Sequence, residues 1–179
     1  VCLRRALAGR REKPGPDHPD TLTSLNDLGS LLHAQGKLDE AEPLYRRALA
    51  GWQEKLGPEH LDTLSSLNNL GNLLKKQGEL DEAELLSREA LDGRREMLGD
   101  KHPNTLNTMN NLANLLADQG DLAAARKMYE RTLEGKESAL GAEHPSTLST
   151  MNNLATLLKE QGDLVTARKM FERTLKGQE

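Results

Sequence analysis

One eleven-residue segment recurs four times at a fixed interval of 42 residues, and this periodicity constrains the fold more than any other feature of the sequence. The segment reads Leu-Ser-Ser-Leu-Asn-Asn-Leu-Gly-Asn-Leu-Leu at residues 64–74, and its other copies lie at 22–32, 106–116 and 148–158. A fixed period of this length is typical of repeat proteins, in which each unit packs mainly against its neighbours. The sequence therefore predicts a stack of similar units instead of a single globular core.

Each copy of the segment has the pattern of a helix with two stripes. Its apolar residues recur at spacings of three and four, which places Leu64, Leu67 and Leu70 on one face. Polar residues such as Asn68 and Asn72 recur in the same way beside them. We expect the leucine stripe to pack and the amide stripe to be the surface where function lies.

A second helix is expected after each copy. Glycines at 36, 78, 120 and 162 follow the copies and suit the left-handed conformation that ends many helices. The first helix of repeat one is predicted at residues 20–35. A second helical pattern begins at Leu38, and Pro43 removes one hydrogen bond there, which predicts a late start or a slight kink.

Composition narrows the class of protein. Aromatic residues make up only 2% of the chain and the mean hydropathy is −0.69, which a stack of small units tolerates better than a single core. Charged residues of both signs are mixed, with a net charge of −4 and no basic stripe, so nucleic acid is not the expected partner. No segment approaches the run of about 18 apolar residues that a membrane span requires.

The sequence contains no recognisable catalytic or metal site. No nucleophile has a plausible base and no glycine-rich phosphate loop is present, so we expect no enzyme and no cofactor. His18, His60, His102 and His144 occur once per repeat, and stacked hairpins lie about 9–10 Å apart, so these side chains cannot converge on one metal ion. We interpret them as helix-entry residues. Cys2 occupies an apolar repeat position and is interpreted as a buried residue, the alternative being a reactive thiol.

The two-helix pattern resembles the tetratricopeptide repeat. Leu67, Leu70, Gly71 and Ala83 match its apolar and small positions. The 42-residue version, with Leu-Gly-Asp-Lys-His-Pro-Asn-Thr at 98–105 and Met-Asn-Asn-Leu-Ala at 109–113, is similar to the arrays of kinesin light chains and nephrocystin-type proteins. The resemblance implies an all-α fold, a right-handed α-solenoid (superhelix) of helical hairpins. The proline that closes the 34-residue pattern is absent, so the second helices are expected to continue to Leu56, Leu98 and Leu140.

The expected organisation is about four repeats behind a leading half-repeat. Residues 1–17 are interpreted as the second helix of a truncated repeat and its turn, followed by repeats at 18–59, 60–101, 102–143 and 144–179. Because the chain opens inside a helix and without Met, we expect it to be part of a longer chain or assembly, and we assign it to the cytoplasm.

The resemblance also implies a function, that of an adaptor or scaffold whose first helices line a concave groove that holds an extended peptide segment of a partner protein. A side-chain amide offers a donor and an acceptor together, so it can pair with a peptide backbone. The alternative for the paired asparagines is that they bond neighbouring first helices and fix the stacking. The candidate peptide-binding residues are Asn26, Asn68, Asn69, Asn72, Lys75, Asn110, Asn111, Asn114, Asn152 and Asn153.

The remaining groove positions carry mixed charge. They include His33, Lys76, Asp118 and Glu160, which do not form the uniform basic wall that an acidic peptide would favour.

A second candidate surface contains the only tryptophan. The counterparts of Trp52 in the other repeats are Arg10, Arg94, Lys136 and Gln178, all polar, so we expect Trp52 to be exposed and to be a possible surface anchor for a partner. The alternative is that it folds onto its own helix. An anchor of this kind fits a second function, that of a structural linker subunit that docks by convex faces and helix edges inside a larger assembly.

Overall fold

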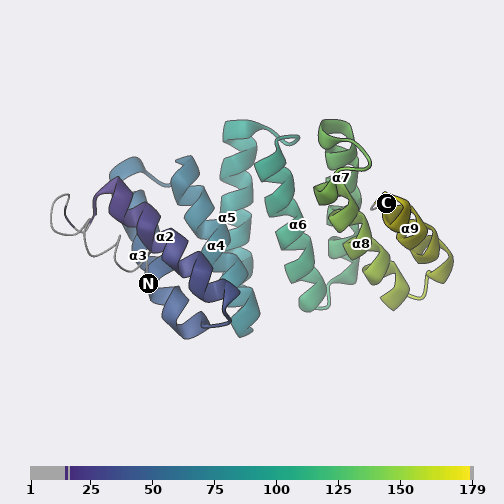
Figure 1. The fold of residues 1–179 in the computed structure, drawn as a ribbon, viewed down its shortest axis with the longest axis horizontal. Helices are drawn as coiled ribbons and strands as arrows, with labels where there is room; N and C mark the ends of the chain where they lie inside the picture. Colours follow the sequence, from purple (N-terminus) through teal and green to yellow (C-terminus); the bar gives the residue numbers. More distant parts are fainter. Residues whose placement is uncertain (1–14, 16, 178–179) are drawn as a thin grey trace. The chain divides into compact units, whose positions relative to one another are not determined.

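The chain is helical throughout the part that the structure describes. The computed structural model describes residue 15 and residues 17–177, which form eight helices and no strand (Figure 1). The leading helix predicted at residues 1–13, Cys2 within it, and residues 14, 16, 178 and 179 lie outside the described part. The helices are α2 (Pro19–Ala34), α3 (Leu38–Leu56), α4 (Leu61–Gln77), α5 (Leu80–Leu98), α6 (Pro103–Asp118), α7 (Leu122–Leu140), α8 (Pro145–Glu160) and α9 (Leu164–Lys176).

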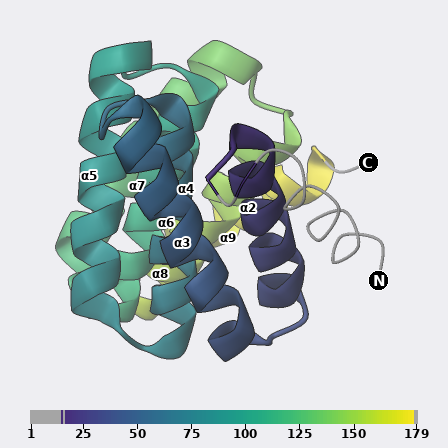
Figure 2. The same cartoon turned by 90° about the vertical axis from the view of Figure 1, so that its left-hand side faces the viewer.

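The helices fall into two compact units, residues 1–93 and residues 94–179. The first unit contains α2, α3, α4 and α5 as far as Gly93, and α3 packs against both α2 and α4. The second contains the end of α5 and helices α6 to α9, and α7 packs against both α6 and α8. Figure 2 turns the same ribbon by 90° and shows α2 and α3 of the first unit as a hairpin. The predicted all-helical repeat architecture is confirmed.

The helix ends follow most of the sequence predictions. Gly36, Gly78, Gly120 and Gly162 all have positive φ angles, between 74° and 89°. The second helices continue without a closing proline to residues 56, 98 and 140, as expected. The late start predicted at Pro43 is wrong, because α3 begins at Leu38 and contains the proline. Burial of Ala41 and Tyr45 in the same helix outweighs one missing backbone bond.

The four repeat histidines cap the first helices. In each case Nδ1 accepts a hydrogen bond from the backbone N–H two residues later, at 3.1–3.2 Å. This bond satisfies one of the donors left free at a helix start. The helix-entry interpretation is therefore confirmed. The capping residues are His18, His60, His102 and His144.

Each hairpin is closed by a leucine that packs against a glycine. A Cβ atom built on Gly93 would lie 2.6 Å from Leu64 Cδ2, and one on Gly135 would lie 2.5 Å from Leu106 Cδ2. The glycine lies on the second helix and the leucine near the start of the first helix of the same hairpin. Lack of a side chain at the glycine lets the two helices approach this closely, so the sequence of the second helix sets the hairpin spacing.

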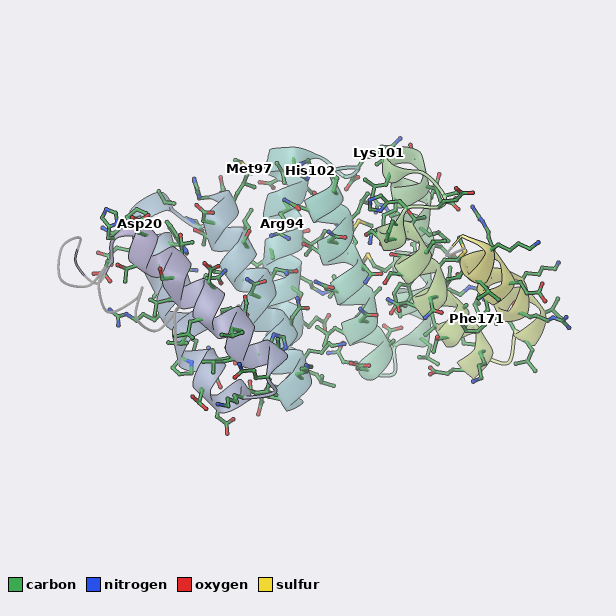
Figure 3. All side chains as sticks on the ribbon, in the orientation of Figure 1. Asp20, Arg94, Met97, Lys101, His102 and Phe171 are labelled. Carbon is green, nitrogen blue, oxygen red and sulfur yellow. The ribbon has the colours of Figure 1, made fainter. Side chains whose placement is uncertain are left out.

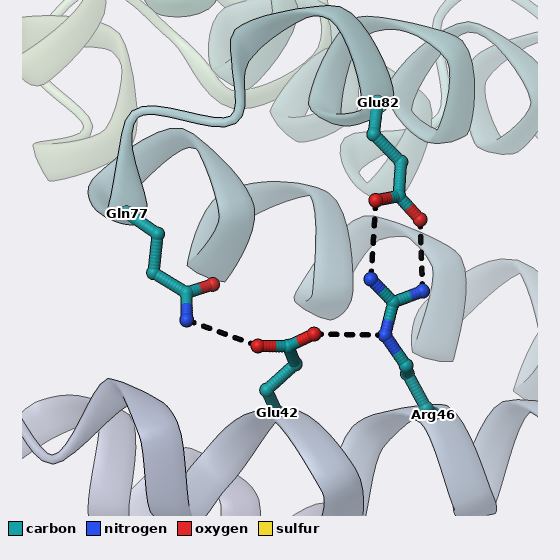
Figure 4. A network of polar contacts seen from close by, with 4 residues as sticks. All are labelled: Glu42, Arg46, Gln77 and Glu82. Atoms are coloured by element: carbon teal, nitrogen blue, oxygen red, sulfur yellow. Dashed lines mark hydrogen bonds and ion pairs between the residues drawn. The ribbon is translucent and has the colours of Figure 1, made fainter.

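In the first unit a polar network joins α3, α4 and α5 (Figure 4). Arg46 binds both carboxylate oxygens of Glu82, at 2.8 and 3.1 Å, and its Nε donates to Glu42 at 2.9 Å. The other oxygen of Glu42 accepts from Gln77 at 3.0 Å. A bidentate guanidinium–carboxylate pair is more directional than a single ion pair, so the network favours one register between the hairpins.

We expect His102→Ala to lower the free energy of unfolding by about 1 kcal/mol, the usual cost of losing a helix N-cap. His102→Asn is the matched control, since asparagine also caps helices and should restore most of the loss. Urea denaturation followed by circular dichroism measures both variants. Equal destabilisation of the two would contradict a capping role.

Candidate functional site

The candidate site is the polar stripe of the first helices, called here the first-helix face. In the first unit it contains residues of α2 and α4, and in the second unit residues of α6 and α8. Every predicted residue on it is partly buried except Asn152, which is exposed. Its residues are Asn26, Asn68, Asn69, Asn72 and Lys75 in the first unit and Asn110, Asn111, Asn114, Asn152 and Asn153 in the second.

In the first unit one asparagine bond crosses between first helices. Asn69 on α4 donates through Nδ2 to Oδ1 of Asn26 on α2, at 3.2 Å. Asn68 and Lys75 also have interaction partners within the chain. For Asn72, no side-chain hydrogen bond is found among the residues that the structure describes. Among the candidate asparagines of this unit, it is therefore the one whose side-chain amide a ligand can engage without competing with the interactions of Asn26, Asn68 or Asn69.

Asn72 lies at the edge of a hollow in the first unit. The hollow has a volume of about 290 Å³ and is lined by Ser30, His33, Ala34, Tyr45, Asn69, Asn72 and Lys76. Tyr45 lines it, with the hydroxyl donating to Ser30 Oγ at 3.0 Å. In the next repeat, Ser87 holds the position of Tyr45 and Asn72 holds the position of Ser30. The serine side chain is too short to reach Asn72 as Tyr45 reaches Ser30.

In the second unit the asparagines are bonded more completely. Asn110 accepts from Thr150 Oγ1 at 3.0 Å, and Asn153 donates to Asn114 at 3.3 Å, so both bonds join α6 to α8. Tyr129 also donates its hydroxyl to Oδ1 of Asn114. These amides hold the first helices together, which is the stacking role that the sequence left open as the alternative.

The two units differ in the charge of this face. In the first unit, burial and the nearby Lys76 ammonium lower the pKa of His33. In the second unit, burial and then the carboxylates of Asp118 and Glu160 raise the pKa of Tyr129. Lys76, Asp118 and Glu160 occupy the same position in successive repeats. The hollow in the first unit therefore favours an anionic group, whereas the corresponding region of the second unit disfavours one.

The predicted exposure of Trp52 is wrong. The side chain is only 5% exposed and packs with Leu22, Leu25 and Ala48 in the core of its own hairpin. The prediction assumed that polar counterparts mark a solvent position, but Arg94 and Lys136, which hold this position in later repeats, are themselves buried. Trp52 is a core residue and not a surface anchor.

Sequence reasoning missed the two buried cations. Lys136 donates to Thr150 Oγ1 at 3.0 Å and to the Ser146 carbonyl at 3.4 Å, which joins α7 to α8. Arg94, labelled in Figure 3, makes the equivalent bonds to α6, with Thr108 Oγ1 at 2.5 Å. In each case the hydroxyl acceptor lies fourteen residues after the cation, and this repeated spacing was the signal that could have found the pair.

Burial changes the chemistry of both cations. Lys136 is 3% exposed, and Arg94 is 7% exposed. Loss of hydration lowers the pKa of Lys136 to about 8 and also lowers the pKa of Arg94. Their hydrogen bonds orient the hairpins, while loss of hydration around the buried charge costs stability.

No metal or membrane site is found in the part of the chain that the structure describes. Within residues 15 and 17–177, no three His, Cys, Asp or Glu side chains come close enough together to hold a metal ion. None of the described helices combines the length and the apolar character needed to cross a membrane.

Known proteins share this architecture. The sequence profile of the tetratricopeptide repeat matches residues 2–54, 25–96, 87–138 and 105–179. A crystal structure of a kinesin light chain from Podospora anserina with nearly identical tetratricopeptide-like repeats is 25% identical, with a TM-score of 0.82 over 98% of this chain and 83% of that one. The crystal structure of BtubC (BKLC) from P. vanneervenii is 23% identical, with a TM-score of 0.84 over 98% of this chain and 70% of that one. No curated protein matches the sequence.

Because Trp52 is packed in the core, Trp52→Ala should lower the free energy of unfolding by about 3–5 kcal/mol. Trp52 is the only tryptophan, so its fluorescence reports on this packing directly. We expect an emission maximum at short wavelength in the folded chain and a shift to longer wavelength in urea. An emission maximum already at the solvent-exposed value in the absence of urea would contradict the packing.

The low pKa of Lys136 predicts that stability rises with pH. The folded state loses this proton near pH 8, whereas the unfolded chain keeps it until about 10.5, so between these values the unfolded state binds more protons. The free energy of unfolding should therefore increase from about pH 8 to about pH 9.5, below the titration of tyrosine.

Lys136→Met should flatten this rise and be at least as stable as the wild type at pH 7, because it removes a buried charge. Urea denaturation across the pH series measures the effect, and the exposed Lys127→Met on the same helix is the matched control. Parallel pH profiles for the wild type and Lys136→Met would show that Lys136 does not titrate in this range.

Proposed function

The chain belongs to the tetratricopeptide repeat family, whose repeats are generally protein–protein interaction modules, and from this premise we propose that it is an adaptor that holds an extended segment of a partner protein on its first-helix face. The hollow at Asn72 carries the proposal. Its lining combines an amide without a side-chain hydrogen bond among the described residues, a tyrosine and a lysine.

An extended peptide suits the chemistry of this hollow. The amide of Asn72 supplies one donor and one acceptor, which matches a peptide group of an extended chain. Its neighbour Asn69 is held by Asn26, and Tyr45 is held by Ser30, so both are fixed before a ligand arrives. Fixed side chains lose little entropy on binding, which favours affinity for a ligand that makes few contacts.

The charged residues of the first-helix face determine which extended peptides are favoured. Lys76 and Lys75 make the end of α4 cationic, and a carboxylate of the ligand would lie well beside them. The acidic residues Asp118 and Glu160 favour the opposite charge in the second unit. We therefore propose a segment whose acidic residue binds the first unit.

A second candidate function, the structural linker, is favoured by a different observation. Asn69–Asn26, Asn110–Thr150 and Asn153–Asn114 are bonded to one another across neighbouring first helices. Side chains used for stacking leave fewer groups for a ligand, and a linker would need only the stacked scaffold. The two functions differ in whether the hollow at Asn72 binds a peptide.

Peptides selected from a random displayed library on the immobilised chain test the proposal. We expect the selected peptides to bind the wild type. Their affinity for the variant Asn72→Ala/Lys76→Glu should be at least about tenfold lower, since a hydrogen bond of the Asn72 side chain and a charge contact of Lys76 are removed. Fluorescence anisotropy of labelled peptides measures the dissociation constants.

The matched control is Gln53→Ala/Lys55→Glu, which makes the same kind of change in the last turn of α3, where Gln53 and Lys55 are exposed. It should bind like the wild type, and circular dichroism should show equal helicity for all three proteins. Equal affinity for both variants, or no enrichment of any peptide, would reject the peptide-binding proposal in favour of the linker.

A further inference from the structure

The hollow at Asn72 has a counterpart in the second unit with the opposite charge. Each residue that lines the hollow has an equivalent two repeats, or 84 residues, later in the chain. Tyr45 is matched by Tyr129, but Lys76 is matched by Glu160. The repeat fold therefore does not require a cation at this position.

Two further lining positions change in the same direction. His33, whose side chain can carry a proton, is Ala117 in the second unit, and Ala34 is Asp118. Beside a shared tyrosine, the first unit thus has two nitrogen side chains that can be cationic, and the second unit has two carboxylates. The charge of the hollow comes from positions 33, 34 and 76 and not from the repeat fold, and it indicates an anionic ligand.

The polar groups around the hollow mostly donate hydrogen bonds. Ser30 Oγ accepts the proton of the Tyr45 hydroxyl at 3.0 Å, so the Ser30 hydroxyl keeps its own proton for a ligand. The ammonium of Lys76 has three N–H donors and the amide of Asn72 has two. His33 adds an imidazole N–H. Donors from several side chains around one small space suit a ligand group with several acceptor oxygens.

The size and the charge of the hollow favour a small dianion. Its volume of about 290 Å³ is at the lower end of the range for small-molecule sites, about 300–1,000 Å³, so it holds one side chain of a larger ligand. Burial and the Lys76 ammonium lower the pKa of His33. A dianion beside both residues would offset the repulsion between them and favour the imidazolium. A group with two negative charges is thus matched better than a group with one.

We propose that the hollow binds the phosphate group of a phosphorylated serine or threonine within the extended segment of the partner. This rests on the proposed function, since it names the residue of the segment that the first unit selects. A phosphomonoester carries a charge of about −1.5 to −2 at pH 7 and three acceptor oxygens. A glutamate or aspartate carries one charge and two oxygens, so it engages fewer donors. The donors of the hollow are Ser30, His33, Asn72 and Lys76.

Peptide arrays with a fixed central residue test the proposal. The central residue is phosphoserine, phosphothreonine, glutamate or serine, and the same set of random flanking sequences surrounds each of them. Peptides that bind the full chain are resynthesised in all four forms, and fluorescence anisotropy in a phosphate-free buffer measures their dissociation constants. The phosphorylated forms should bind at least about tenfold more tightly than the glutamate form, the effect of one additional charge-assisted hydrogen bond. The serine form should bind more weakly than the glutamate form.

The variant His33→Ala/Lys76→Glu gives the hollow the residues that the second unit has at these positions. The ratio of the dissociation constants of the glutamate and phosphoserine forms should fall from at least about ten to about one or below. Both forms are measured on the same protein, so partial unfolding would not change this ratio. Lys55→Glu makes the same change of charge at an exposed position of α3 and should keep the wild-type ratio. Lys76→Arg should also keep it, since a guanidinium binds phosphate.

Equal affinity of the glutamate and phosphoserine forms for the wild type would overturn the phosphate proposal and leave the proposed function in place. A preference for phosphoserine that persists in His33→Ala/Lys76→Glu would also overturn it, because the phosphate would then bind elsewhere. Displacement of the phosphopeptides by an equal concentration of free O-phosphoserine would identify a free phosphomonoester, and not a partner segment, as the ligand. Binding of no peptide in any form would reject the proposed function as well.

Discussion

The packing of a leucine from each first helix against a glycine of its second helix is the contact on which the other features depend. Leu64 and Leu106 approach Gly93 and Gly135 so closely that no Cβ atom would fit without movement. This contact fixes the distance and rotation of the two helices in a hairpin. Once the leucine stripe is turned inward, the amide stripe beside it is turned outward, so the candidate binding face follows from the core.

The amide stripe serves two purposes that differ between positions. Where a neighbouring first helix supplies a partner, as for Asn69 and Asn153, the amide satisfies a partly buried group and fixes the register. Where the second helix carries serine in place of tyrosine, as at Ser87, the amide of Asn72 has no side-chain hydrogen bond among the residues that the structure describes. A single substitution on one helix thus changes the role of a residue on another, and the repeats need not be equivalent in function.

The position of Trp52 shows how a stack can vary while its geometry is kept. Tryptophan fills the site in the first repeat by apolar burial, whereas Arg94 and Lys136 fill it with hydrogen bonds to the next first helix. Apolar filling is more stabilising, and hydrogen bonding is more directional. Lys136, a cation held by neutral acceptors, has a fixed orientation at some cost in stability.

The sequence by itself determined the repeat length, the helical pattern, the glycine helix ends and the capping histidines, because each depends on residues close together in the chain. It also identified the polar stripe that contains Asn72 and Asn114. Only the tertiary structure decided which of these amides bond one another, and that Trp52 and Lys136 are buried. The physical reason is that exposure depends on the neighbouring helix: a polar side chain can be buried wherever the next repeat supplies its acceptors, as Thr150 does for Lys136.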